Sequence, residues 1–334
     1  MQPLFLLASL TLLLLILPSG NAQRRVGIVL GTGGTGGVYF YYGTTLADLL
    51  NRAGVAEVQA VSTQGSYDNL LLLRDRTNPG SNTYFCALTT VDSAYVAFLG
   101  EDPRFKDKPA KSQRVLFYMY PSFIHVVTTE KKGITVLQHL KNRRVSTGPP
   151  GSSSENLALL LLSAVGISPK DFAKHERLPI AEGAKALAEG TLDALINVSG
   201  VPTGAIVELS QTLARKGDRI RFIPLDPKST ASQILDKRFP GLVTPFKLSK
   251  EHYGTVGDTP GLAVGNIVVC PDSLPTEVAY AFVKQVFDNL AFLQSSVAAA
   301  RDTSLESTVG LYGKLPIPFH PGAERYLRER GLIR

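Results

Sequence analysis

Residues 26–52 read VGIVLGTGGTGGVYFYYGTTLADLLNR, and this stretch decides the fold. The short apolar run Val26–Leu30 predicts a buried strand, and five of the next seven residues are glycines. From Val38 to about Arg52, leucines at helical spacing predict a helix with one apolar face. A buried strand, a glycine-rich turn and a helix in this order begin an α/β unit.

The same alternation continues along the first third of the chain. Val55–Ser62 predicts a second strand, and a helix that begins at Gly65-Ser66 follows it. Tyr84–Leu88 predicts a third strand. Strands that alternate with helices in this way indicate a parallel sheet with right-handed crossovers.

After residue 115 the pattern starts again. Two apolar runs, Val115–Tyr120 and Ile124–Thr128, are separated by a Pro-Ser pair and are expected to form two strands. A loop rich in glycine and serine, Gly148–Ser154, then opens a helix over Glu155–Val165. Further strands are predicted at 144–146, 192–198, 220–225 and 262–270, and further helices at 181–189, 205–216 and 276–293.

No low-complexity linker separates the two halves, so we expect two lobes joined by crossing strands rather than two independent domains. Lobe I is expected to comprise residues 23–121 and 262–334, and lobe II residues 122–261. The predicted fold class is therefore α/β, with a mostly parallel sheet flanked by helices in each lobe and a cleft between them.

The first residues have the composition of a signal peptide. Leu4–Leu17 is almost wholly apolar, and Gly20 and Ala22 occupy the −3 and −1 positions of a small-residue cleavage site. A membrane-spanning helix needs about 20 apolar residues, and this run is shorter. No Lys or Arg precedes the run, which departs from the usual pattern, and a retained anchor is the alternative. We expect residues 1–22 to be removed and the mature protein to be periplasmic.

Charge and cysteine content exclude several classes of function. The 334 residues carry a net charge of +7, but the Lys and Arg residues are scattered and no aromatic ladder accompanies them, so nucleic-acid binding is not expected. Cys86 and Cys270 could form one disulfide or remain two buried thiols, and the thiols are favoured. Two cysteines cannot form a structural zinc site, so we expect no metal and no cofactor.

The glycine-rich loop Gly31–Gly36 matches the G-x-G-x-x-G pattern of dinucleotide-binding folds. That pattern also requires an acidic residue near the end of the second strand, and Glu57 lies at its beginning instead. We therefore favour a different use. The N–H groups of the first turn of a helix lack internal partners, carry partial positive charge and bind carboxylates or phosphates.

Three such helix starts, at Gly31–Gly37, Gln64–Ser66 and Gly151–Ser154, are divided between the two lobes. If they converge on one cleft, they form a site for a small anion. The alternative is that each is a tight turn with a capping Ser or Thr.

The sequence contains no evident catalytic arrangement. No G-x-S-x-G motif is present, and the five histidines lie in unrelated contexts. Asp92 and Glu155 could act as an acid–base pair, but they are more simply explained as residues at helix starts. An exported hydrolase would need a histidine or acid near Ser152–Ser154 in the folded chain. No catalytic residues are predicted.

These loops resemble the TAXI-type solute-binding proteins of the tripartite TRAP transporters. The resemblance covers roughly residues 25–334 and rests on the order and spacing of modest motifs. They are Gly33–Tyr39, Gly65–Leu70, Leu88–Asp92, Leu140–Gly148, Gly190–Ala194, Gly200–Pro202 and His320–Ala323 with Tyr326 and Gly331. Two departures are Ser153, where the family usually has glycine, and Thr89-Thr90 before Asp92.

The resemblance implies a type II periplasmic-binding-protein fold and a TRAP permease as partner. We expect the protein itself to be a monomer. It also implies a small carboxylate ligand, either an amino acid such as glutamate or a dicarboxylate, and an ammonium group would be neutralised by Asp92 or Glu155. A sensing adaptor for a membrane receptor is the alternative. The expected ligand-binding residues are Thr32, Gly33, Gly34, Tyr39, Gln64, Gly65, Ser66, Asn69, Thr90 and Asp92 in lobe I, and Ser152, Ser153, Ser154, Glu155, Pro202 and Tyr253 in lobe II.

Overall fold

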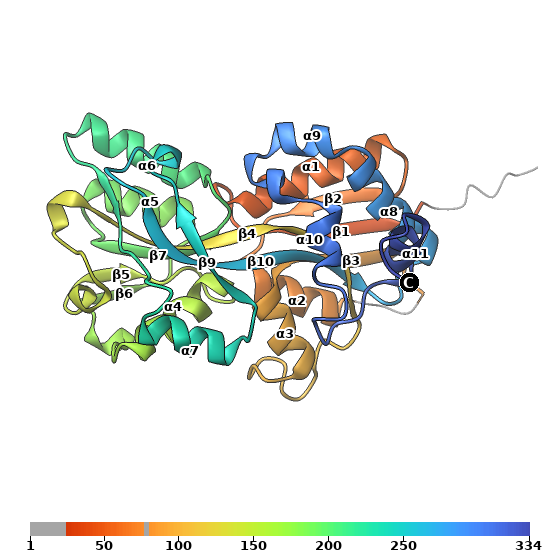
Figure 1. The fold of residues 1–334 in the computed structure, drawn as a ribbon, viewed down its shortest axis with the longest axis horizontal. Coiled ribbons are helices and arrows are strands. Elements are labelled where there is room, and N and C mark those ends of the chain that lie inside the picture. Colours follow the sequence, from red (N-terminus) through yellow and green to blue (C-terminus); the bar gives the residue numbers. More distant parts are fainter. Residues whose placement is uncertain (1–24, 77–79) are drawn as a thin grey trace, which may run out of the picture.

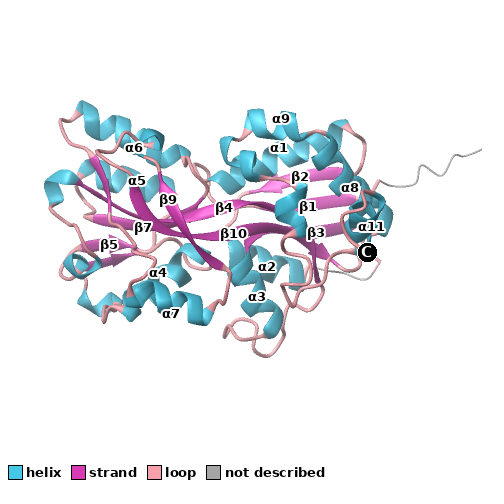
Figure 2. Cartoon of the chain, viewed as in Figure 1, coloured by secondary structure: helices cyan, strands magenta, loops and turns pink. Residues whose placement is uncertain are grey.

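A computed structural model describes residues 25–76 and 80–334 of the chain. The predicted signal peptide, residues 1–22, lies outside the described residues. Two lobes lie side by side along the long axis of the molecule (Figure 1). One ten-stranded sheet runs through both of them, in the order β2-β1-β3-β10-β4-β7-β5-β6, with β8 paired to β4 and β9 paired to β10. Figure 2 shows this continuity of the strands across the two lobes.

Lobe I begins with the predicted β-loop-α units. Its N-terminal elements are β1 (Gly27–Gly31), α1 (Val38–Arg52), β2 (Glu57–Val61), α2 (Ser66–Asp75), β3 (Thr83–Thr90) and α3 (Val91–Leu99). Its C-terminal helices are α8 (Thr276–Asp288), α9 (Leu290–Ser296), α10 (Leu305–Val309) and α11 (Pro321–Glu329). β1 pairs in parallel with both β2 and β3, as predicted. Helices α1, α8 and α9 pack together near one face of the sheet, and α2 and α3 pack near the other (Figure 1).

Lobe II repeats the arrangement. It contains β5 (Arg144–Ser146), α4 (Ser153–Ala164), β6 (Lys174–Glu176), α5 (Ile180–Glu189), β7 (Ala194–Ser199), α6 (Gly204–Arg215), β8 (Ile220–Phe222), α7 (Thr230–Arg238) and β9 (Val243–Leu248). Short 3-10 turns in the described residues of both lobes are η1 (Glu130–Lys132), η2 (Leu137–Leu140), η3 (Pro169–Asp171), η4 (Lys250–His252) and η5 (Ala298–Asp302). β5 pairs in parallel with β6 and β7. The mixed α/β, two-lobed fold class predicted from the sequence is confirmed.

Two long strands connect the lobes: β4 (Gln113–Thr129) and β10 (Thr259–Pro271). The expectation of two strands over 115–120 and 124–128 was wrong, because β4 is continuous through Pro121. Pro121 lies opposite Gly265, where the β4–β10 register shifts, and such an irregularity tolerates a residue without an N–H donor. The lobe boundaries at 121/122 and 261/262 fall inside or beside these strands and remain a prediction.

Cys86 of β3 and Cys270 of β10 form a disulfide. The favoured expectation of two free thiols was therefore wrong. The two strands are antiparallel neighbours with Ala87 opposite Val269, so the next residue pair outward is the cysteine pair. The pairing could not be predicted from the sequence, because 184 positions separate the two cysteines. The disulfide joins the N-terminal units of lobe I to a strand that crosses both lobes.

Candidate functional site

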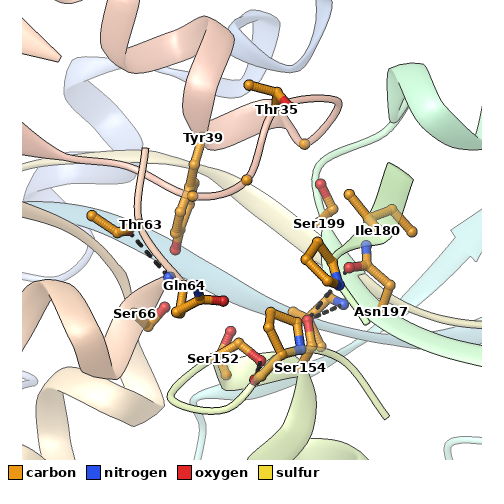
Figure 3. Close-up of a pocket in the computed structure, with 18 of the residues that line it drawn as sticks. Thr35, Tyr39, Thr63, Gln64, Ser66, Ser152, Ser154, Ile180, Asn197 and Ser199 are labelled. Atoms are coloured by element: carbon orange, nitrogen blue, oxygen red, sulfur yellow. Dashed lines mark hydrogen bonds between the residues drawn. The ribbon is translucent and has the colours of Figure 1, made fainter. Parts of the chain in front are cut away.

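A cavity of about 280 Å³ lies between the lobes (Figure 3). Lobe I supplies the glycine-rich loop and the start of α1, together with the segment that leads from β2 into α2. Lobe II supplies the starts of α4 and α5 and the end of β7. The lining residues are Gly33, Gly34, Thr35, Gly37, Val38, Tyr39, Ser62, Thr63, Gln64, Gly65, Ser66, Pro149, Ser152, Ser153, Ser154, Pro179, Ile180, Ala181, Glu182, Asn197, Val198 and Ser199.

The lobe I wall consists of two loops tied to each other by hydrogen bonds. Thr32 donates through both its N–H and its hydroxyl to the carbonyl of Val61, at 3.1 and 2.7 Å. The Ser62 hydroxyl donates to the Gly33 carbonyl at 3.0 Å, and the Thr63 hydroxyl donates to the Thr32 carbonyl at 3.0 Å. The glycine-rich loop and the 62–65 segment therefore form one rigid surface.

Glycines occur where the lobes touch. Gly36 has a φ of +89°, and a Cβ there would lie 3.4 Å from the Cβ atoms of Ala181 and Ala205 in lobe II. Gly65 has a φ of +116°, a region open almost only to glycine, and a Cβ there would lie 3.5 Å from that of Ser152. The lobes also share backbone hydrogen bonds on both sides of the cavity, from Ala205 N–H to the Gly36 carbonyl and from Tyr67 N–H to the Gly151 carbonyl. The structure is thus a closed form.

Tyr39 connects the cavity to a crossing strand. Its hydroxyl donates to the side-chain oxygen of Asn266 in β10 at 2.5 Å, and the Asn266 amide donates to Ser122 of β4 at 2.8 Å. Burial raises the pKa of Tyr39 above its usual range, the Ser66 hydroxyl lowers it, and the charge of Asp92 raises it further. Tyr39 therefore stays protonated at neutral pH.

The lobe II wall is built on the start of α4. Ser152 caps this helix, because its hydroxyl accepts from Glu155 N–H at 3.1 Å and donates to the Pro149 carbonyl at 2.7 Å. The Ser154 hydroxyl accepts from Val198 N–H at 2.9 Å and lies 3.5 Å from the side-chain oxygen of Asn197. Asn197 is 8% exposed, and its amide nitrogen has no hydrogen-bond partner within the described chain. Figure 3 shows Ser154, Asn197 and Ser199 grouped on this wall.

The cavity has almost no formal charge. None of its lining side chains is Lys, Arg or His, and the one charged lining residue is the exposed Glu182. Attraction for an anion must come from the first turns of α1, α2, α4 and α5 and from hydroxyl and amide donors. These helix starts and neutral side chains are the donors that the cavity offers to a small anion.

Nine of the predicted ligand-binding residues line the cavity: Gly33, Gly34, Tyr39, Gln64, Gly65, Ser66, Ser152, Ser153 and Ser154. The other seven lie outside it: Thr32, Asn69, Thr90, Asp92, Glu155, Pro202 and Tyr253. Four of these seven are fully buried in lobe I, so the loops that they support come between them and the cavity.

The supporting roles in lobe I are specific. Asn69 donates through its amide to the Thr32 carbonyl at 2.7 Å and to the Leu88 carbonyl at 2.8 Å, which fixes the glycine-rich loop against β3. Thr90 donates through its N–H to the Ser66 hydroxyl at 3.1 Å. Asp92 is fully buried, and one of its carboxylate oxygens has no hydrogen-bond partner within the described chain.

The three outlying residues of lobe II also have other partners. Glu155 forms an ion pair with Arg177, so its charge is already neutralised. The Tyr253 hydroxyl accepts from Thr203 N–H at 2.8 Å and belongs to the core of lobe II. Pro202 follows a cis peptide bond in the turn that leads to α6.

The contribution of β7 and of the start of α5 to the cavity was not predicted from the sequence. The missed lining residues that carry polar side chains are Thr35, Ser62, Thr63, Glu182, Asn197 and Ser199. One signal was present: Asn197 and Ser199 are polar positions at alternate sites of an otherwise apolar strand. Polar groups at the end of a buried strand are candidates for a site at the sheet edge.

Residues 30–331 match the model of the NMT1-like family. The chain belongs to the NMT1-like family. The narrower TAXI assignment is not part of this match. Within the described part of the chain, no helix is long and apolar enough to cross a membrane, and no group of three His, Cys, Asp or Glu side chains could hold a metal ion.

Several solved structures share the fold of this NMT1-like protein. The periplasmic binding protein BugD is 11% identical, with 93% of this chain and 94% of that chain covered and a TM-score of 0.56. MatC from Rhodopseudomonas palustris with bound malate is 15% identical, with 84% and 89% covered and a TM-score of 0.53. The binding-protein component of an ABC phosphonate transporter from Pseudomonas aeruginosa is 13% identical, with 84% and 80% covered and a TM-score of 0.52.

The expectation of a binding protein rather than an enzyme agrees with these neighbours. Their fold is the type II periplasmic-binding-protein fold, which confirms the predicted fold class. Within the described residues, the hydroxyls of Ser152 and Ser154 bond to backbone groups and to Asn197, and neither bonds to a histidine.

Proposed function

We propose that this NMT1-like protein is an extracytoplasmic solute-binding protein that captures a small carboxylate and delivers it to a membrane permease. The observation that carries the proposal is the cavity between the lobes, with four helix starts and a set of neutral donors along its walls. The proposal includes removal of residues 1–22 as a signal peptide and the lobe boundaries given above. The contacts between the lobes support a transport role, because only the closed form presents both lobes to a partner in fixed register.

The contacts between the lobes explain how a ligand would favour closure. A solute that touches both walls binds the closed form better than the open form, so it shifts the population towards closure. Neutral donors and helix starts can hold a carboxylate in this way without trapping it by a strong ion pair. Release to a permease then requires only that the lobes open.

A thermal-shift screen of carboxylates tests the proposal. Purified mature protein is heated with amino acids including glutamate, with mono- and dicarboxylates, and with phosphonates as comparison anions. Binding to the folded state alone raises Tm, because about 2.7 kcal/mol of stability is added at a ligand concentration of 100 Kd. We expect a carboxylate to raise Tm in a concentration-dependent way. If no carboxylate shifts Tm at millimolar concentration, the proposed ligand class is wrong.

The partner is the finer part of the proposal. The sequence resemblance to TAXI proteins favours a TRAP-type permease. One solved neighbour is a component of an ABC phosphonate transporter, which makes an ABC-type permease the second candidate. Uptake of the identified solute into vesicles separates them, since a TRAP-type permease is driven by an ion gradient and an ABC-type permease requires ATP.

A further inference from the structure

The two walls of the cavity differ in the charge that lies behind them. Behind the lobe II wall, the carboxylate of Glu155 is paired with Arg177 and contributes little net charge to the cavity. Behind the lobe I wall lies Asp92, in the first turn of α3. Among the described residues, Asp92 forms no ion pair with a Lys, Arg or His residue, and its Oδ1 atom has no hydrogen-bond partner.

A short chain of hydrogen-bonding groups links this carboxylate to the cavity. Ser93 lies 3.5 Å from Asp92, and the Thr90 hydroxyl donates to the Ser93 hydroxyl at 2.8 Å. Thr90 N–H in turn donates to the hydroxyl of Ser66, which lines the cavity. Ser93, Thr90 and Ser66 therefore lie between the Asp92 charge and the cavity, in a region where water does not screen the charge.

From this asymmetry we infer that Asp92 is a specificity-determining residue, which excludes a second negative charge from the lobe I end of the cavity. A solute with one carboxylate places it against the donors of the lobe II wall and leaves an uncharged or cationic end near Tyr39. A dicarboxylate of the same length would bring its second charge towards an unpaired buried carboxylate, with no cation among the lining residues to offset the repulsion.

The protonation states of the surrounding groups are consistent with this role. Burial raises the pKa of Asp92 to about 6, opposed by hydrogen bonds from Thr90 and from backbone N–H groups, so the carboxyl is mostly ionised above pH 7. The titratable groups that face it are Tyr39 from α1 and Tyr67 from α2. Burial raises the pKa of both tyrosines, so neither gains a charge that could replace that of Asp92.

The inference rests on the proposed function, and a matched pair of probes tests the two separately. Butyrate and succinate have the same chain length and differ by one carboxylate. At pH 7.5, calorimetry of the wild-type protein should show tighter binding of butyrate than of succinate. Asp92→Asn should raise the affinity for succinate roughly tenfold, because it removes a buried unit charge that water does not screen. The affinity for butyrate should change less than threefold.

Glu57→Gln is the control variant. It removes a lobe I carboxylate that does not line the cavity and that is exposed to solvent, so the preference between the probes should change less than twofold. If both probes bind and Asp92→Asn leaves their ratio unchanged, the role of Asp92 is refuted while solute binding stands. If neither probe nor any other carboxylate binds the wild-type protein, the proposed function fails and this inference fails with it.

A measurement on the wild-type protein decides the question if the Asp92→Asn variant does not fold. Ethanesulfonate and ethane-1,2-disulfonate stay fully ionised between pH 7.5 and 5.0. As the pH falls through 6 and Asp92 gains a proton, binding of the disulfonate should strengthen relative to the monosulfonate. A constant ratio across this range would overturn the inference.

Discussion

The two walls of the cavity both present helix starts and neutral donors, but they are built differently. The lobe I wall consists of two glycine-containing loops tied to each other by backbone carbonyls, with a buried unpaired carboxylate behind them. The lobe II wall consists of a capped helix start and the polar end of β7, with a neutralised ion pair behind it. Both walls carry hydrogen-bond donors, yet the net charge behind the donors is negative in lobe I and neutral in lobe II. The placement of the donors and the charge behind them can therefore change independently. Lobe II should contribute most of the affinity for the anionic group, and lobe I should contribute shape and discrimination.

The sharpest test of that division places one new negative charge on each wall. Asn197→Asp puts a carboxylate at a site that is 8% exposed, beside Ser154. Repulsion in this poorly solvated position and loss of the amide donor should weaken carboxylate binding by roughly a hundredfold or more. Gln64→Glu adds the same charge to the exposed edge of the lobe I wall, where solvent screens it, and should weaken binding less than fivefold.

Titration calorimetry with the carboxylate identified in the thermal screen measures both effects. Circular dichroism and the Tm without ligand show whether each variant is folded. Equal losses in the two variants would contradict the assignment of the anionic group to lobe II. Asn197→Ala removes the donor without adding charge. Its loss of affinity should lie between those of Asn197→Asp and Gln64→Glu, at roughly tenfold.

The same comparison shows which parts of the site the sequence could predict. The lobe I loops were predictable because Gly33, Gly65 and Ser66 are adjacent in sequence to the helix starts that they form, so local composition indicates them. Asn197 and the start of α5 reach the cavity only through the packing of β7 beside β4, and a single sequence does not contain that pairing. The free thiols were expected for the same reason, since the pairing of β3 with β10 brings Cys86 to Cys270.

Burial explains the residues that were placed in the site but lie behind it. Thr32, Asn69 and Thr90 are polar residues within the predicted loops, and a sequence pattern cannot tell a polar group that faces a ligand from one that holds the loop. Here each bonds to backbone or hydroxyl groups of the loops themselves. The fold class was predictable because it depends on the order of strands and helices. The division of β4 at Pro121 was wrong because pairing with β10 keeps the strand continuous despite the Pro-Ser pair.

A second prediction concerns shape rather than charge. Gly65 has a φ of +116°, and its Cα faces Ser152 across the closed cavity. Gly65→Ala should disfavour this backbone conformation and with it the closed arrangement of the 62–65 segment against Ser152, so carboxylate binding should weaken roughly tenfold. Gly54→Ala is the matched control, because Gly54 also has a positive φ but a Cβ added there would meet no atom within 4 Å. It should lower Tm slightly and leave Kd unchanged.

Small-angle X-ray scattering shows whether a change in Kd at Gly65 is accompanied by a change in the closure of the two lobes. The Gly65→Ala variant should remain more open than the wild-type protein at the same ligand saturation. A variant that closes normally and binds with wild-type affinity would show that close approach at Gly65 is unimportant.

The smallest expected effect lies at the rim of the cleft, where the lobes meet without touching the cavity. Arg238 of α7 donates to Glu101 after α3 at 2.8 Å, and both side chains are about 40% exposed. An exposed ion pair contributes about 0.2–1 kcal/mol, so Arg238→Glu should weaken ligand binding by a factor of roughly two to five, and the loss should shrink in high salt. The double variant Glu101→Arg/Arg238→Glu restores opposite charges and should recover most of the affinity. Recovery would show that Arg238 acts on binding through Glu101. A double variant as weak as the single one would contradict this.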